Sequence, residues 1–172
     1  FTKMAIPHIP CLRFGDPYVS LNEIEVNDYR DGTPKATVSQ VNAGVVRRDL
    51  QRIDEARAAL RKFTTAELIE IGAKAGEIFL NGKVQIGVEG EMQSPQEYIE
   101  TLSSTSGLPH VMVKRNMDKI HYALTNMQIV LNGLTRGIDM PILDAGFGEQ
   151  FGTQVCFYPT SKALGLVMPS NS

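Results

Sequence analysis

Apolar and polar residues alternate in two parts of this 172-residue chain and recur with a helical period between them. Residues 21–41 alternate on both sides of Asp31-Gly32, the pattern of an antiparallel β-hairpin with a tight turn. From about 43 to 135, apolar residues return every three or four positions, which predicts helices. Alternation resumes at 153–160, and a continuous apolar run at 163–168 predicts a strand that is covered on both faces.

Start and stop residues divide the helical region. Asn42 is the expected N-cap of the first helix, and the second and third begin at capping boxes formed by Thr64 with Glu67 and by Ser94 with Glu97. We expect the second helix to end at 81–82 and the third near 103. The apolar face predicted for the first helix consists of Val46, Leu50, Ile53, Ala56 or Arg57, and Leu60.

The longest predicted helix follows 107–109 and carries an apolar stripe with steps of four and three residues. Its members are Val113, Met117, Ile120, Leu124, Met127, Leu131 and Leu134. Such a stripe is typical of the interior flank of a globular domain or of a dimer face built on one. A coiled-coil seam is the alternative.

The order of these elements predicts an α/β fold. We expect one domain over 1–172, with an irregular proline-containing arm at 1–20, the hairpin at 21–41, helices at 43–135 and strands at 153–168. An α/β fold fits this order only if further strands follow these last ones. An inner strand that ends at 168 leaves two faces and an edge to be covered, so we expect the sequence to be part of a longer protein.

Composition excludes several classes of function. The net charge is −2, and the sequence contains no run of five like charges, so neither a nucleic-acid surface nor an anionic membrane surface is indicated. No apolar run reaches the length of a membrane-spanning helix. Cys11 and Cys156 are far apart in the sequence, and we expect two reduced, buried thiols in a cytoplasmic protein, with a disulfide between them as the alternative.

Few motifs carry chemistry. Gly146, Gly148 and Gly152 resemble a phosphate-binding loop in spacing, but a strand follows them where a helix is needed, so a surface connection is the expected structure. The three histidines, His8, His110 and His121, lack metal-ligand spacing, and we expect them to face solvent or to accept ordinary hydrogen bonds.

Asn171 is the strongest candidate for a functional side chain. It follows the predicted inner strand, and ligands of open α/β sheets bind beyond the carboxyl ends of the strands. Its amide N–H₂ can donate to a developing oxyanion. Serine and asparagine are also common in turns, so the spacing alone leaves both interpretations open.

Residues 165–172, GLVMPSNS, resemble the strand-end region of the aldehyde dehydrogenase superfamily, and SSTSGLPHVMVKRNMDKI at 103–120 is similar to the branch that includes acyl-CoA reductases. The resemblance implies that Asn171 binds the carbonyl oxygen while a thiohemiacetal forms. It also implies that the last strands begin a Rossmann-like cofactor-binding sheet, in which the backbone around Val167, Met168, Pro169 and Ser170 lines the cofactor, NAD or NADP. The implied partners are a small-molecule aldehyde or acyl-CoA and further copies of the chain in a homo-oligomer.

Two departures from the family pattern accompany the resemblance. Many members carry an aromatic residue where Ser170 stands, and the nucleophilic cysteine, the general-base glutamate and the glycine-rich cofactor helix follow this region in the family. A non-catalytic helical interaction or oligomerisation module, built on the stripe from Val113 to Leu134, is the alternative function. A family member that binds nucleotide without chemistry is a third.

Overall fold

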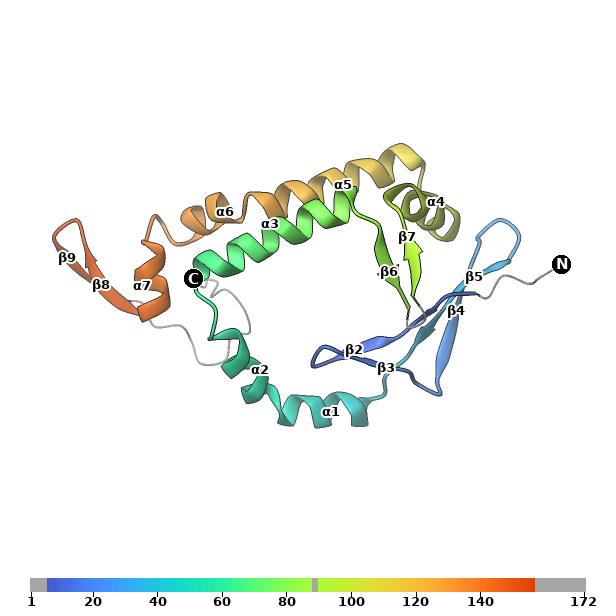
Figure 1. The fold of residues 1–172 in the computed structure, drawn as a ribbon, viewed down its shortest axis with the longest axis horizontal. Helices are drawn as coiled ribbons and strands as arrows, with labels where there is room; N and C mark the ends of the chain where they lie inside the picture. Colours follow the sequence, from blue (N-terminus) through green and yellow to red (C-terminus); the bar gives the residue numbers. More distant parts are fainter. Residues whose placement is uncertain (1–5, 88–89, 157–172) are drawn as a thin grey trace. The chain divides into compact units, whose positions relative to one another are not determined.

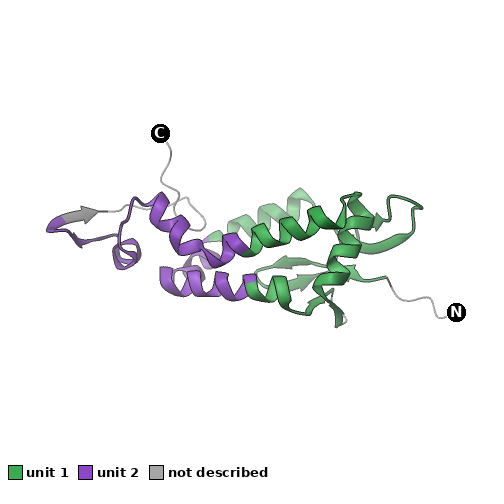
Figure 2. Cartoon of the chain, turned by 90° about the horizontal axis from the view of Figure 1, so that it is seen from above, with its two compact units in different colours: residues 1–53, 77–121 green, residues 54–76, 122–172 purple. Residues whose placement is uncertain are grey.

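Figure 1 shows the computed structural model of the chain, in which residues 6–87 and 90–156 are described. Two compact units are present: residues 1–53 with 77–121, and residues 54–76 with 122–172 (Figure 2). The border between them runs through two helices, α3 (Thr65–Asn81) and α5 (His110–Thr125). Each unit therefore combines segments that are distant in the sequence.

The hairpin predicted at 21–41 is confirmed in the first unit. It consists of β4 (Glu23–Asn27) and β5 (Pro34–Ser39), which pair in antiparallel fashion. The Asp31 carboxylate accepts the Thr33 N–H at 2.9 Å, and Gly32 supplies a φ of +75°. A third strand, β1 (His8–Ile9), pairs in parallel with β5 and gives the strand order β1-β5-β4.

The segment expected to be an irregular arm, 1–20, contains regular structure. Besides β1, it forms a hairpin of β2 (Cys11–Arg13) and β3 (Asp16–Tyr18). Pro17 lies within β3, opposite Leu12. Each strand of a two-stranded sheet has a free edge, where the missing N–H of proline costs no ladder hydrogen bond, so the prolines did not exclude strands.

The helix predicted after Asn42 forms, but it is interrupted once and buries a different face from the one predicted. The Asn42 side chain accepts the Val45 N–H, as expected of an N-cap, and α1 runs over Ala43–Gln51. Arg52 interrupts the helix, which continues as α2 (Ile53–Leu60). Val45 is buried, whereas Val46 and Leu50 of the predicted apolar face are exposed. The prediction of one continuous helix with that buried face was wrong.

A hairpin that the sequence analysis did not predict precedes the third predicted helix. Its strands are β6 (Val84–Ile86) and β7 (Glu91–Gln93). The capping box at 94–97 is confirmed at the start of α4 (Pro95–Ser106), which ends three residues later than expected. Gly107 ends it with φ +78°, a left-handed conformation that glycine adopts without a steric cost.

A small apolar core holds the helices of the first unit together. Ile99 of α4 and Val113 and Met117 of α5 are buried in contact with one another. Phe79 of α3 packs against this cluster and meets the Tyr98 ring edge-to-face, with the centroids 5.7 Å apart. The first two members of the predicted apolar stripe are therefore core residues.

The long helix predicted after 109 is not continuous. α5 ends at Thr125, and α6 covers Met127–Leu134. Asn126 lies between them, and its side-chain Nδ2 donates to the Tyr122 carbonyl at 2.8 Å. An asparagine side chain that bonds backbone groups competes with helical hydrogen bonds, which explains a break inside an unbroken apolar period.

The second unit buries Leu131 of α6 and Ile142 of α7 (Met140–Ala145). It ends in a hairpin of β8 (Phe147–Gln150) and β9 (Thr153–Cys156). The described residues thus form a mixed α/β fold with seven helices and small sheets. Of the strands predicted at 153–168, only β9 lies within the described residues, and it pairs with β8 in antiparallel fashion. Among residues 6–87 and 90–156, every helix is too short or too polar to cross a lipid bilayer.

Candidate functional site

The site residues predicted from the end of the chain, Asn171 and Val167, Met168, Pro169 and Ser170, lie outside the described residues. Their roles remain predictions. The described part of the chain does contain five clusters of polar side chains. The chemistry available to each cluster follows from its geometry.

The glycine-rich segment at 146–152 does not fit a cofactor pyrophosphate. Gly146 ends helix α7 and Gly148 lies in strand β8, so the order is helix, glycine, strand, the reverse of a dinucleotide loop. A Cβ on Gly148 would approach Cγ1 of Ile142 to 2.7 Å, so this glycine serves close packing. Gly152 supplies a φ of +73° in the β8–β9 turn. The expectation that this is not a phosphate loop is confirmed, although the segment is more ordered than a simple connection.

Two carboxylates occupy the N-terminus of α3, where an anion would otherwise bind. The Glu67 carboxylate accepts the Thr64 N–H at 2.7 Å, which confirms the predicted capping box. That backbone hydrogen bond, followed by the one from the Thr64 hydroxyl, holds the pKa of Glu67 below its usual range. Asp144 of α7 accepts the next N–H, from Thr65, at 2.8 Å. The helix end is therefore closed by the protein itself.

A serine, a histidine and a glutamate meet at the β1-β5-β4 sheet in the order of a hydrolase triad. His8 Nε2 lies 2.9 Å from the Ser39 hydroxyl, and His8 Nδ1 lies 2.8 Å from the Thr37 hydroxyl. Glu23 is 3.7 Å from Nδ1, beyond hydrogen-bond distance. Ser39 is buried and its hydroxyl already accepts the Ser20 N–H at 2.9 Å. This hydroxyl is not accessible to a substrate. The hydrogen bonds of the cluster connect β1 to β5.

Cys11 belongs to the same cluster. Its thiol donates to the Ser39 carbonyl at 3.1 Å and forms no disulfide within the described residues. Cys11 is partly buried rather than buried, and the expectation that both thiols are reduced stays a prediction, because the side chain of Cys156 lies outside the described residues.

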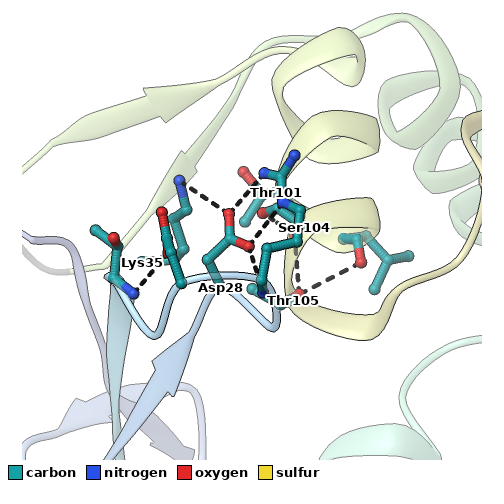
Figure 3. A network of polar contacts seen from close by, with 9 residues as sticks. Asp28, Lys35, Thr101, Ser104 and Thr105 are labelled. Carbon is teal, nitrogen blue, oxygen red and sulfur yellow. Dashed lines mark hydrogen bonds and ion pairs between the residues drawn. The ribbon is translucent and has the colours of Figure 1, made fainter.

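Asp28 forms the most densely bonded polar cluster, shown in Figure 3. Its carboxylate, almost fully buried, accepts Nε and Nη2 of Arg30 at 2.9 and 2.7 Å and lies 3.6 Å from Nζ of Lys35. The side-chain hydrogen bonds from Arg30 hold the pKa of Asp28 well below its usual range. The next residue, Tyr29, donates its N–H to the Ser104 carbonyl of α4. Both carboxylate oxygens are engaged within the β4–β5 hairpin, and the Tyr29 N–H anchors its turn to α4.

The histidines behave as predicted. His121 Nε2 lies 2.7 Å from the Glu77 carboxylate, and this hydrogen bond lowers the pKa of Glu77. His110 is exposed at the start of α5. Residues 6–87 and 90–156 contain no group of three metal-ligating side chains.

Sequence reasoning missed the ion pair between Arg13 and Asp49, which joins the β2–β3 hairpin to α1. Arg13 Nε donates to Asp49 Oδ2 at 2.8 Å, and the Arg13 guanidinium lies 4.9 Å from the centre of the Tyr18 ring. The two charged residues are 36 positions apart, so no local pattern reveals the pair.

No protein-family model, no curated protein and no solved structure matches the chain.

Proposed function

We propose that this chain supplies the N-terminal part of an NAD(P)-dependent oxidoreductase similar to the aldehyde dehydrogenases, which oxidises an aldehyde or, in reverse, reduces an acyl thioester. The observation that carries the proposal is the stretch GLVMPSNS at 165–172. The family resemblance includes an upstream order of a hairpin, an amphipathic helix and a long helix. The described residues support the proposal, because they contain a hairpin, the helix at 65–81 and the α5–α6 pair in that order.

The proposed chemistry gives Asn171 a defined task. A cysteine thiolate forms a C–S bond to the aldehyde carbon, and the electron pair of the C=O bond moves to oxygen. The Asn171 side-chain N–H donates to that oxyanion and stabilises it more than the neutral carbonyl. When the C=O bond re-forms, hydride leaves the same carbon and a thioester remains, which water or CoA then cleaves. NAD or NADP would accept the hydride.

The proposal does not assign that thiolate to Cys11, whose thiol donates a hydrogen bond to the Ser39 carbonyl within the sheet cluster. In the family, the cysteine and the general-base glutamate follow this region. The proposal therefore places both of them after Ser172 in the complete protein.

A turnover assay on the product of the complete gene tests the proposal. Aldehyde-dependent reduction of NAD⁺ or NADP⁺ is expected, and residues 1–172 alone should show none. Absence of turnover with aldehydes and acyl-CoA thioesters of varied chain length would contradict it. Turnover by residues 1–172 alone would equally overturn the assignment of the nucleophile.

Exposed apolar side chains on α5 and α6 favour the second candidate, a helical interaction module. Tyr122 and Ile129 are each about two-thirds exposed (68% and 67%). Replacing the half-buried Leu124 and Met127 together with glutamate separates the two ideas. Dissociation of an oligomer into folded monomers favours the module, whereas global unfolding identifies these positions as core.

A further inference from the structure

The net charge of −2 is unevenly distributed along the chain. Residues 43–62 contain six basic and three acidic residues, so the rest of the chain is acidic on balance. Helix α1, at the start of this segment, carries two adjacent arginines, Arg47 and Arg48, and both are exposed. Within the described part of the chain neither of them forms a hydrogen bond or an ion pair.

The one acidic residue of α1, Asp49, does not offset these two charges. Both of its carboxylate oxygens accept hydrogen bonds from Arg13 of β2, with Nε of Arg13 at 2.8 Å from Oδ2. The guanidinium of Arg48 attracts the Asp49 carboxylate only through space. The ion pair with Arg13 is neutral as a whole, so Arg47 and Arg48 leave this surface of the first unit positively charged.

Apolar side chains share the surface with the arginines. Val45 is buried and Asp49 is bonded to β2, so these two residues define the inner side of α1. Val46 and Leu50 are one turn apart on another side and are 44% and 57% exposed. Arg47 lies beside them, three residues before Leu50. A helix that presents apolar side chains flanked by arginine is typical of a helix that lies on a membrane surface.

We propose that this face of α1, formed by Val46, Arg47, Arg48 and Leu50, binds the surface of an anionic lipid bilayer. The arginines attract the phosphate groups, while Val46 and Leu50 enter the boundary between head groups and acyl chains. A lipid surface suits both kinds of side chain at once, whereas an acidic peptide or a free phosphate would pair with the arginines alone. Two arginines and two apolar side chains give weak, reversible binding. The inference does not depend on the proposed enzymatic function.

Co-sedimentation of the complete protein with lipid vesicles tests the proposal. Vesicles that contain about one-third phosphatidylserine should bind the protein, less so at high salt, and vesicles of phosphatidylcholine alone should bind little. Arg47→Glu/Arg48→Glu should lower the affinity for the anionic vesicles about tenfold or more. Lys114→Glu/Lys119→Glu makes the same change of charge at exposed positions of α5 and is the matched control, which should bind like the wild type.

Two further variants test the apolar part of the surface and its accessibility. Leu50→Ser keeps the charge and should still weaken vesicle binding several-fold. Leu50→Cys in the complete protein should react with a water-soluble maleimide faster than the wild type does, and anionic vesicles should slow the reaction.

A complete protein that does not bind anionic vesicles would overturn the proposal. So would equal weakening by the α5 variant. Binding of polyglutamate without vesicle binding would identify an acidic protein as the partner instead. A Leu50→Cys protein that reacts no faster than the wild type would show that the remaining chain covers α1, which also contradicts the proposal.

Discussion

The β2–β3 and β8–β9 hairpins have the same turn but differ in how each is anchored. In both, the turn is a Phe-Gly dipeptide, and the residue before it joins the hairpin to a neighbouring segment. Arg13 does so through its ion pair with Asp49. Gln150 does so with a neutral amide, which donates to the Gly137 carbonyl at 2.7 Å and accepts the Asp139 N–H at 3.2 Å.

The difference shows what the dipeptide determines and what it does not. Phe-Gly is found with the same left-handed backbone at both tips, so the turn geometry is local. The environment of the ring is not local, because Phe14 lies under Arg52 and Phe151 is exposed. The charged anchor should respond to pH and salt, and the neutral anchor should not.

The largest expected effect comes from the two turn glycines. Gly15→Ala and Gly152→Ala each place a Cβ at positive φ, and no atom lies within 4 Å of either Cβ, so the cost is backbone strain alone. Each change should lower the free energy of unfolding by about 1 kcal/mol, measured by urea denaturation. Clearly unequal losses of unfolding free energy would contradict the claim that the two hairpins have the same turn.

Removal of the charged anchor should have the next largest effect. The hydrogen bond from Arg13 lowers the pKa of Asp49. A lowered folded-state pKa gives stability that is present above the unfolded value, near 4, and is lost as the pH falls further. Asp49→Ala should lower Tm by about 1–2 °C at pH 7, and the loss should shrink near pH 3.

Amide hydrogen exchange at pH 6 and pH 3 resolves this effect by hairpin, after correction for the intrinsic pH dependence of exchange. Protection of β2 and β3 should fall in acid, while protection of β8 and β9 should not. Gln150→Ala provides the matched control, because it loosens only β8–β9 and does so at both pH values. Equal acid sensitivity of the two hairpins would contradict the assignment of their anchors.

The smallest expected effect comes from replacing the two turn phenylalanines, Phe151 and Phe14. Phe151→Asn should raise the free energy of unfolding by about 0.5 kcal/mol or less, because it relieves strain and gives up no burial. Phe14→Asn relieves the same strain but removes the Arg52 contact, so little net change is expected. Parallel urea titrations of both variants measure the difference, which vanishes if Arg52 does not stabilise Phe14.

Local patterns in the sequence predicted the β4–β5 hairpin and the starts of three helices, because a turn or a capping box involves neighbouring residues. The helix breaks at Arg52 and Asn126 escaped prediction, since the apolar period continues through both. Strands β6 and β7 were missed because three residues are too few to show alternation.

Side-chain clusters were beyond sequence reasoning for another reason. Asp144 caps α3 from 79 positions away, and His8 reaches Ser39 across a parallel strand pair. Only tertiary structure brings such residues together. The predicted catalytic Asn171, in contrast, was inferred from a local stretch of sequence, and its role remains to be measured.

The turnover number of Asn171→Ala in the complete protein tests the central claim most directly. If the Asn171 amide donates to the oxyanion, kcat should fall by about 10²–10³ with little change in KM, as for other lost oxyanion donors. Ser172→Ala, one position further, serves as the control and should keep kcat near that of the wild type. An Asn171→Ala protein with unchanged kcat would contradict the proposed function.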